Sequence, residues 1–153
     1  MKTDIAILYA TMTGNARECA ESTAALLNKA GLPARVHDLA HYDPRRLLEE
    51  TTVVLTISTW GEGEPPDDGL DFFNHVSNLE PSSLANLRFA VFALGDTSYD
   101  NFCQCGRDLD RMFEEHGATR LIDRVDNDID FQDALEKWQE TLLSTTLQDA
   151  VAA

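Results

Sequence analysis

The sequence is poor in cysteine and in positive charge, and it has no long hydrophobic run. Its three cysteines, Cys19, Cys103 and Cys105, are too few for a disulfide scaffold, and their odd number argues against secretion. No apolar run approaches the roughly 20 residues that a membrane span needs. The first apolar run, residues 5–10, is too short for a signal peptide. These absences predict a soluble cytoplasmic protein with reduced thiols.

The shortage of positive charge is large, because 12 Lys and Arg residues stand against 27 Asp and Glu residues, for a net charge of −15. Such a surface repels phosphate backbones and anionic lipids, which argues against nucleic acid and membranes as partners. It attracts basic proteins over long distances. We therefore expect the partners of this protein to be basic proteins.

The length and composition fit one folded domain. A chain of 153 residues can bury a core without disulfide or metal support. Its hydrophobic fraction of 43% and charged fraction of 25% are ordinary for a globular protein. We expect a single, monomeric domain over residues 1–153, with residues 147–153 as a frayed tail.

Short apolar runs alternate with stretches of helical spacing five times along the chain. The runs that predict strands lie at residues 5–10, 34–39, 52–58, 89–94 and 118–125. The helical stretches lie at residues 15–30, 43–50, 69–79 and 102–116, and from Asp130 onward. This alternation predicts an α/β fold in which a doubly wound, five-stranded parallel sheet carries helices on both faces. The second strand is the most polar, which indicates an edge position.

In such sheets a ligand binds beyond the carboxyl ends of the strands, so three loops need attention: 11–16, 58–68 and 95–103. The first loop reads Thr11-Met12-Thr13-Gly14-Asn15-Ala16. Its glycine permits a tight turn, and the helix that follows presents N–H groups to an anion. We interpret the loop as a phosphate cradle, although a turn without a ligand would look the same. It lacks the lysine of a nucleotide-binding P-loop.

The other two loops each carry an aromatic residue directly after a strand. Trp60 follows Ser58-Thr59, and Tyr99 lies within the loop that begins at Gly95. Trp60 could be a lid over the end of the sheet. Together with the cradle, however, two aromatic side chains predict a slot for a flat ring with a phosphate tail.

The three loops resemble those of flavodoxins. The shared motifs are Thr-x-Thr-Gly-Asn-Ala, Ser-Thr-Trp-Gly-Glu-Gly and Leu-Gly-Asp-x-Ser-Tyr-x-x-Phe, in this order. The resemblance covers residues 4–146, is of the short-chain type, and is strongest to the FMN domains of diflavin reductases such as the sulfite reductase flavoprotein. It implies the strand order 2-1-3-4-5 and non-covalently bound FMN.

The resemblance also implies a set of cofactor-binding residues. Those around the phosphate would be Thr11, Met12, Thr13, Gly14, Asn15 and Ala16, where Ala16 replaces the Ser or Thr of many flavodoxins. Those on one side of the ring would be Ser58, Thr59, Trp60, Gly61 and Gly63. Those on the other side would be Leu94, Gly95, Asp96, Tyr99, Asn101, Phe102 and Cys103. We expect no catalytic residues and no metal.

The function that this resemblance implies is a low-potential, one-electron carrier without a substrate site of its own. It would take electrons from a separate NAD(P)H-dependent reductase and pass them to an acceptor such as a haem enzyme. The alternatives are an FMN domain of a diflavin reductase and a flavodoxin-like activator dedicated to one pathway. A phosphoacceptor receiver domain shares the architecture, but it needs acidic residues where this chain has Tyr9-Ala10-Thr11.

The sequence allows more than one role for three acidic residues that follow the last predicted strand. Asp126, Asp128 and Asp130 could form a solvated turn with a helix cap. They could equally contribute to partner docking or to the electric field at a flavin.

Overall fold

The computed structural model describes residues 4–10, 14–58, 67–95, 103–127 and 130–152. Its strands are β1 (Ile5–Ala10), β2 (Ala34–Asp38), β3 (Thr52–Ser58), β4 (Arg88–Leu94), β5 (Thr119–Arg120) and β6 (Val125–Asn127). Its α-helices are α1 (Asn15–Lys29), α2 (Leu70–Ser77), α3 (Gln104–Glu115) and α4 (Gln132–Ala152), and short 3-10 helices cover Pro44–Glu49 and Asp67–Gly69. Within these residues no helix is both long and apolar enough to cross a bilayer.

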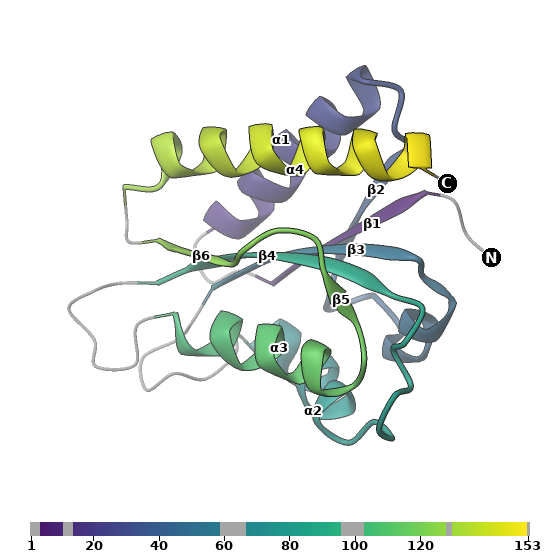
Figure 1. Cartoon of the computed structure of the whole chain (residues 1–153). Coiled ribbons are helices and arrows are strands. Elements are labelled where there is room, and N and C mark those ends of the chain that lie inside the picture. Colours follow the sequence, from purple (N-terminus) through teal and green to yellow (C-terminus); the bar gives the residue numbers. More distant parts are fainter. Residues whose placement is uncertain (1–3, 11–13, 59–66, 96–102, 128–129, 153) are drawn as a thin grey trace.

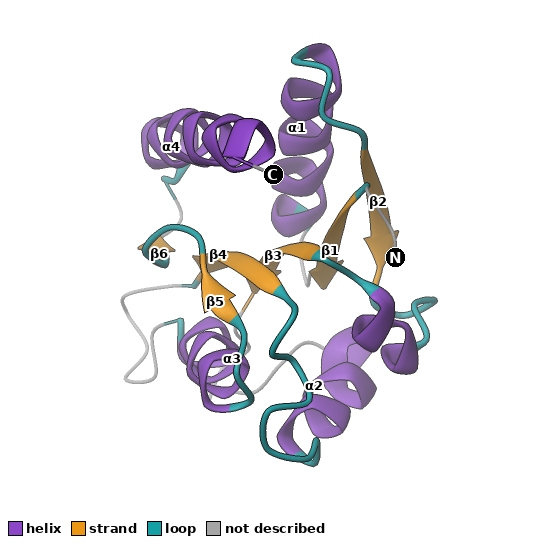
Figure 2. Ribbon diagram, turned by 45° about the vertical axis from the view of Figure 1, so that its right-hand side comes forward, coloured by secondary structure: helices purple, strands orange, loops and turns teal. Residues whose placement is uncertain are grey.

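All pairings in the sheet are parallel, and the strand order is β2-β1-β3-β4-β5, with β6 also paired to β4. This confirms the order that the sequence resemblance implied, with the polar strand β2 at an edge. Helices α1 and α4 cover one face of the sheet, and α2 and α3 cover the other (Figures 1 and 2).

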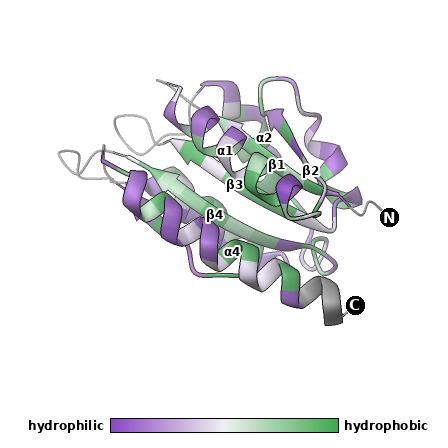
Figure 3. Cartoon of the chain, turned by 90° about the horizontal axis from the view of Figure 1, so that it is seen from above, coloured by the Kyte–Doolittle hydropathy of each residue, from purple (hydrophilic) through white to green (hydrophobic). Residues whose placement is uncertain are grey.

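Both faces of the sheet are buried, because helices cover each face and successive side chains along a strand point to opposite faces. In β1, Ala6 and Leu8 join the core beneath α2 and α3, whereas Ile5 and Ile7 join the core beneath α1 and α4. Figure 3 shows the central strands as hydrophobic and the helices as mixed. The continuous apolar runs of the sequence therefore correspond to the two-sided core of a parallel sheet.

The fifth strand differs from the expectation of one strand over residues 118–125. It is split into β5 and β6, and residues 121–124 lie between them. Phe89 pairs with Arg120 and Phe92 pairs with Val125. An advance of three residues along β4 therefore lies opposite an advance of five residues from β5 to β6. The two extra residues form a bulge, which interrupts the ladder of hydrogen bonds.

Both ends of the last helix also differ from expectation. The helix begins at Gln132, two residues after the exposed Asp130, rather than directly after an Asp130 cap. It continues to Ala152, so residues 147–152, which we expected to fray, are helical. The short helix after Asp43 agrees with its prediction, since the Asp43 carboxylate accepts a hydrogen bond from the Arg45 N–H at 3.0 Å.

Candidate functional site

Parallel pairing brings the predicted loops to one edge of the sheet. In register, Ala10 lies beside Ile57, Ser58 beside Leu94, and Leu94 beside Asn127. The ends of β1, β3, β4 and β6 therefore form a row at the carboxyl edge. This is the edge at which doubly wound sheets bind ligands.

The structure describes part of the predicted cofactor-binding set at this edge. The described members are Gly14, Asn15, Ala16, Ser58, Leu94, Gly95 and Cys103. The members that lie outside the described residues are Thr11, Met12, Thr13, Thr59, Trp60, Gly61, Gly63, Asp96, Tyr99, Asn101 and Phe102. For those residues the assignments stay predictions.

The beginning of α1 has the form expected of an anion site. Gly14 precedes the helix with φ +93°, a left-handed conformation that strains other residues. A Cβ atom at this position would have no described neighbour within 4 Å. No described side chain caps the helix here. The first-turn N–H groups have no acceptor within the helix, and an anion suits both them and the helix dipole.

A buried hydroxyl holds this helix start against the sheet. Thr56 lies in β3 with no exposed surface, and its Oγ1 donates a hydrogen bond of 2.8 Å to the carbonyl oxygen of Ala16. Ala16 lies in the first turn of α1 and is itself fully buried. Arg17, the nearest cation to the first loop, is exposed and pairs with Glu21 at 2.8 Å. The cradle is therefore positioned from the sheet side.

Helix α3 approaches the same edge from the opposite face. A Cβ atom at Gly106 would lie 2.4 Å from the Ala93 Cβ, so only glycine permits this helix to lie so close to β4. The residue before the helix, Cys103, is fully buried and adopts φ +54°, ψ +24°. A left-handed backbone is unusual for a residue with a side chain.

Asn127 links the ends of β4, β6 and α3. Its carbonyl oxygen accepts a hydrogen bond from the Gly95 N–H at 2.8 Å and one from the Cys103 thiol at 3.5 Å. Its side-chain Nδ2 donates to the Ala93 carbonyl at 3.4 Å. Burial raises the pKa of the Cys103 thiol to about 12, so the thiol remains protonated and able to donate at neutral pH.

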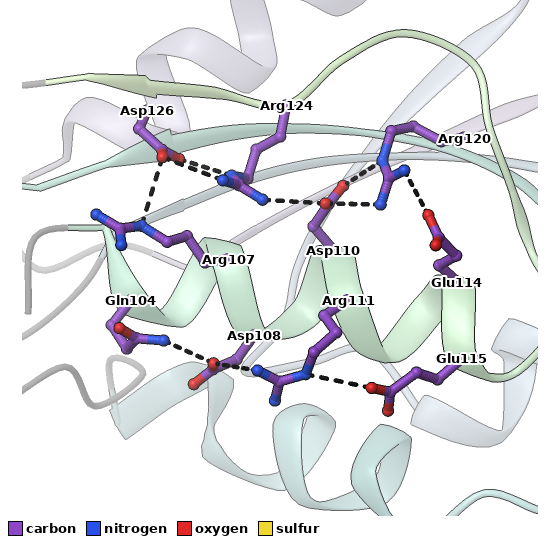
Figure 4. Close-up of polar contacts among 10 residues, drawn as sticks. All are labelled: Gln104, Arg107, Asp108, Asp110, Arg111, Glu114, Glu115, Arg120, Arg124 and Asp126. Atoms are coloured by element: carbon purple, nitrogen blue, oxygen red, sulfur yellow. Dashed lines mark hydrogen bonds and ion pairs between the residues drawn. The ribbon is translucent and has the colours of Figure 1, made fainter.

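A chain of ion pairs joins α3 to the split fifth strand (Figure 4). Asp110, which is buried, pairs with Arg120 at 2.8 Å and with Arg124 at 3.1 Å. Asp126 pairs with Arg124 at 2.8 Å and with Arg107 at 3.4 Å. The open question about Asp126 is thereby narrowed, because two guanidinium groups balance its charge and weaken its field beyond them. Asp128 lies outside the described residues.

A separate cavity of about 360 Å³ opens between the β5–β6 connection and α4. It is lined mainly by apolar side chains, among them Ile122, Val125 and Trp138. Among the described residues of the three predicted loops, none lines it. The described lining of the cavity is therefore separate from the described part of the carboxyl-edge site.

Two residues that shape the site were not in the predicted set. Thr56 lies in a strand rich in β-branched residues, and threonine is common in strands for reasons of packing alone. Asn127 stands between Asp126 and Asp128, and only the charge of these two aspartates was considered from the sequence. Both act through contacts with distant segments, at Ala16 and at Gly95, which no local pattern encodes.

The donor set can bind a phosphate and orient a planar group. Helix N–H groups and a left-handed glycine suit a phosphate dianion, and a row of strand ends of this kind is where doubly wound sheets bind ligands. The described residues therefore suit the phosphate end of a cofactor, while the predicted ring-facing residues lie mostly outside the described part of the chain.

Comparison with known proteins agrees with this geometry. Residues 7–140 match the family described as flavodoxin. The flavoprotein alpha-component of NADPH sulfite reductase from Buchnera aphidicola is 40% identical over 141 residues, and that from Bacillus subtilis is 38% identical over 140 residues. Each match covers 92% of this chain, but only 24% and 23% of those proteins. The chain thus spans about a quarter of the length of these relatives.

Solved flavodoxin structures match in fold and in length. A flavodoxin from Streptococcus pneumonia TIGR4 is 32% identical with a TM-score of 0.79, covering 93% of this chain and 98% of that one. A short-chain flavodoxin associated with a PDU bacterial microcompartment is 26% identical with a TM-score of 0.80, covering 94% and 99%.

Proposed function

The chain belongs to the flavodoxin family, and from this membership we propose that it is a low-potential, one-electron carrier that uses non-covalently bound FMN. The observation that carries the proposal is the start of α1. There a left-handed Gly14 precedes a helix start that no described side chain caps, and Thr56 of β3 holds the first turn of that helix through the Ala16 carbonyl. When bound, FMN supplies one-electron redox chemistry that amino-acid side chains lack.

In this proposal the residues of the chain bind and orient the cofactor. The first turn of α1 holds the phosphate, while Ser58, Leu94 and Gly95 mark the positions from which the ring-facing loops depart. Exposed carboxylates near the edge, such as Asp67 and Asp68, disfavour added negative charge and so favour a low potential. The chain contributes no substrate site of its own.

The proposed partners are a separate NAD(P)H-dependent reductase and an acceptor such as a haem enzyme, both presenting basic surfaces. The protein works as a monomer. The net charge of −15 supports basic partners, and the likeness in fold to a solved flavodoxin that is 32% identical supports a carrier.

A second candidate function is the FMN domain of a diflavin reductase. It is favoured by the 40% identity to a sulfite reductase flavoprotein, against 32% to the flavodoxin from Streptococcus pneumonia. The two candidates differ in where the electron enters. A carrier is reduced only through another protein, whereas an FMN domain receives electrons from the flavin domain of its own chain.

Purification with added FMN tests the proposal. We expect a yellow protein that releases about one FMN per chain on denaturation, and that an NADPH-dependent flavodoxin reductase reduces in solution. NADPH alone should not reduce it. A protein that stays colourless and does not quench FMN fluorescence would overturn the proposed function.

A further inference from the structure

A cation lies in the first turn of the helix at which we propose that the phosphate binds. Arg17 is the third residue after Gly14, the residue that caps the start of α1. The side chain at this helix position is placed to reach back to the cap, as it does in a capping box, because Cβ atoms tilt toward the N-terminus of a helix. An arginine there can therefore reach an anion that the first N–H groups of α1 hold.

In the structure Arg17 contacts the next turn of the same helix instead. Its Nε donates a hydrogen bond of 2.8 Å to the Glu21 carboxylate, and the two side chains are 63% and 56% exposed. An exposed pair of this spacing is weak, and arginine before glutamate is the less favourable order along a helix. The contact uses Nε alone, whereas a guanidinium carries four more N–H groups on its terminal nitrogens. The pair therefore leaves most of the donors of Arg17 available.

The charge of Arg17 also acts at the carboxyl edge of the sheet. Tyr9, near the end of β1, donates from its hydroxyl to Asp38 at the end of β2, at 3.3 Å. Burial is the main cause that raises the pKa of Tyr9, and Asp38 adds to it, whereas the positive charge of Arg17 lowers it. Such an effect needs a charge close by. The guanidinium therefore lies near the edge from which the first predicted loop departs.

We propose that Arg17 is a phosphate-binding residue that exchanges the Glu21 carboxylate for the FMN phosphate when the cofactor binds. The inference rests on the proposed function, because it assumes that the phosphate binds at the start of α1. A phosphate dianion accepts two parallel, charge-assisted hydrogen bonds from a guanidinium, which outweigh the single exposed contact with Glu21. Arg17 thus raises the affinity for FMN, and Glu21 lowers it by competing for the same cation.

The variant Arg17→Gln tests the contact with phosphate. Affinities for FMN and for riboflavin are measured by fluorescence quenching, and urea unfolding of the apoprotein confirms that the exposed substitution leaves the fold intact. FMN should bind about tenfold more weakly, for one lost hydrogen bond to a charged group. Riboflavin should bind as to wild type, because it has no phosphate. An equal loss for both flavins would overturn the role of Arg17.

The variant Glu21→Gln tests the exchange. It should strengthen FMN binding about twofold in the wild-type background, the weight of one exposed helix pair, and leave riboflavin unchanged. In the Arg17→Gln background it should give no gain, because no cation is left to release. Simple repulsion between Glu21 and the phosphate would instead give the same gain in both backgrounds, and that result would overturn the exchange.

The matched control is Glu18→Gln, which removes an equal charge from an exposed residue of the same helix turn. Adjacent residues on a helix do not face each other, so Glu18 does not compete for Arg17. Its effect on FMN affinity should be the same with and without the Arg17→Gln change, whereas the effect of Glu21→Gln should differ between the two backgrounds.

The two possible failures are distinguishable. A wild-type protein that binds neither flavin would show that the proposed function itself fails. A wild-type protein that binds FMN, together with an Arg17→Gln variant that binds it equally well, would leave the proposed function standing and overturn the phosphate-binding role of Arg17.

Discussion

At the scale of single residues, one buried hydroxyl connects the sheet to the start of α1, where we propose that the phosphate binds. Thr56 Oγ1 donates to the Ala16 carbonyl, and Ala16 lies in the first turn of α1. Thr56→Val removes this bond with little change of shape. We expect FMN to bind several-fold more weakly and riboflavin to bind as before, because riboflavin has no phosphate for α1 to hold.

Thr146→Val is the matched control for this change. Thr146 is also buried, and its Oγ1 donates to the Leu142 carbonyl at 2.6 Å, entirely within α4. Each variant should lower the free energy of unfolding of the apoprotein by about 1 kcal/mol. Only Thr56→Val should separate FMN from riboflavin in a fluorescence titration, and equal losses for both ligands would contradict the role in phosphate binding.

At the scale of elements, the split fifth strand depends on a carboxylate from another element. Asp110 of α3 is buried and pairs with Arg120 of β5 and with Arg124, which directly precedes β6. Asp110→Asn removes the buried charge that Arg120 and Arg124 share, so that Arg120 keeps only Glu114 and Arg124 keeps only Asp126 as an acidic partner. We expect the free energy of unfolding to fall by about 1–3 kcal/mol, between the values for exposed and for buried pairs.

Urea unfolding of the apoprotein measures this effect. The control is Glu21→Gln, which breaks the exposed Arg17–Glu21 pair and should cost less than about 0.5 kcal/mol. Amide hydrogen exchange should also accelerate across β5 and β6 in Asp110→Asn. Equal stability of the two variants would show that the network does not support the edge of the sheet.

The split strand also shows where prediction from sequence ends. Leu121, Ile122 and Val125 form an apolar pattern that predicts one continuous strand over 118–125. The two extra residues between β5 and β6 become visible only when these strands are paired with β4. Local periodicity does not encode this pairing. By contrast, β1, β3 and β4 were predictable, because burial on both faces leaves a continuous apolar run in the sequence itself.

The candidate site likewise has parts that the sequence predicts and parts that it does not. The places where the loops leave the sheet were predictable, since glycine and polar residues follow directly after the apolar runs that form β1, β3 and β4. The supports were not, because each depends on a partner far along the chain: Thr56 on Ala16, and Asp126 on Arg107. The sequence left open whether Asp126 belongs to a solvated turn, to a docking surface or to the field at a flavin, and its arginine partners balance much of its charge locally.

At the scale of the whole molecule, the net charge of −15 should govern encounters with redox partners. Most described arginines already pair with acids of the same chain, as Arg35 does with Asp4, so unpaired carboxylates dominate the field. Transfer from a basic reductase should slow as ionic strength rises, because salt screens charges that are farther apart than a Debye length, which is about 8–10 Å near physiological salt and shorter at higher salt. A rate that does not change with salt would show that charge does not guide docking.

The location of the negative charge should affect the rate of electron transfer from a partner as much as the net charge does. A Cβ atom at Gly69 would lie 3.0 Å from the Ala10 Cβ, so α2 begins at the carboxyl edge and Asp71 lies in its first turn. Glu80 follows the other end of α2, toward the amino end of β4. Asp71→Lys and Glu80→Lys change the net charge equally at exposed positions. Stopped-flow reduction should slow more in Asp71→Lys and lose part of its salt dependence, whereas equal rates in the two variants would mean that partners do not dock at the carboxyl edge.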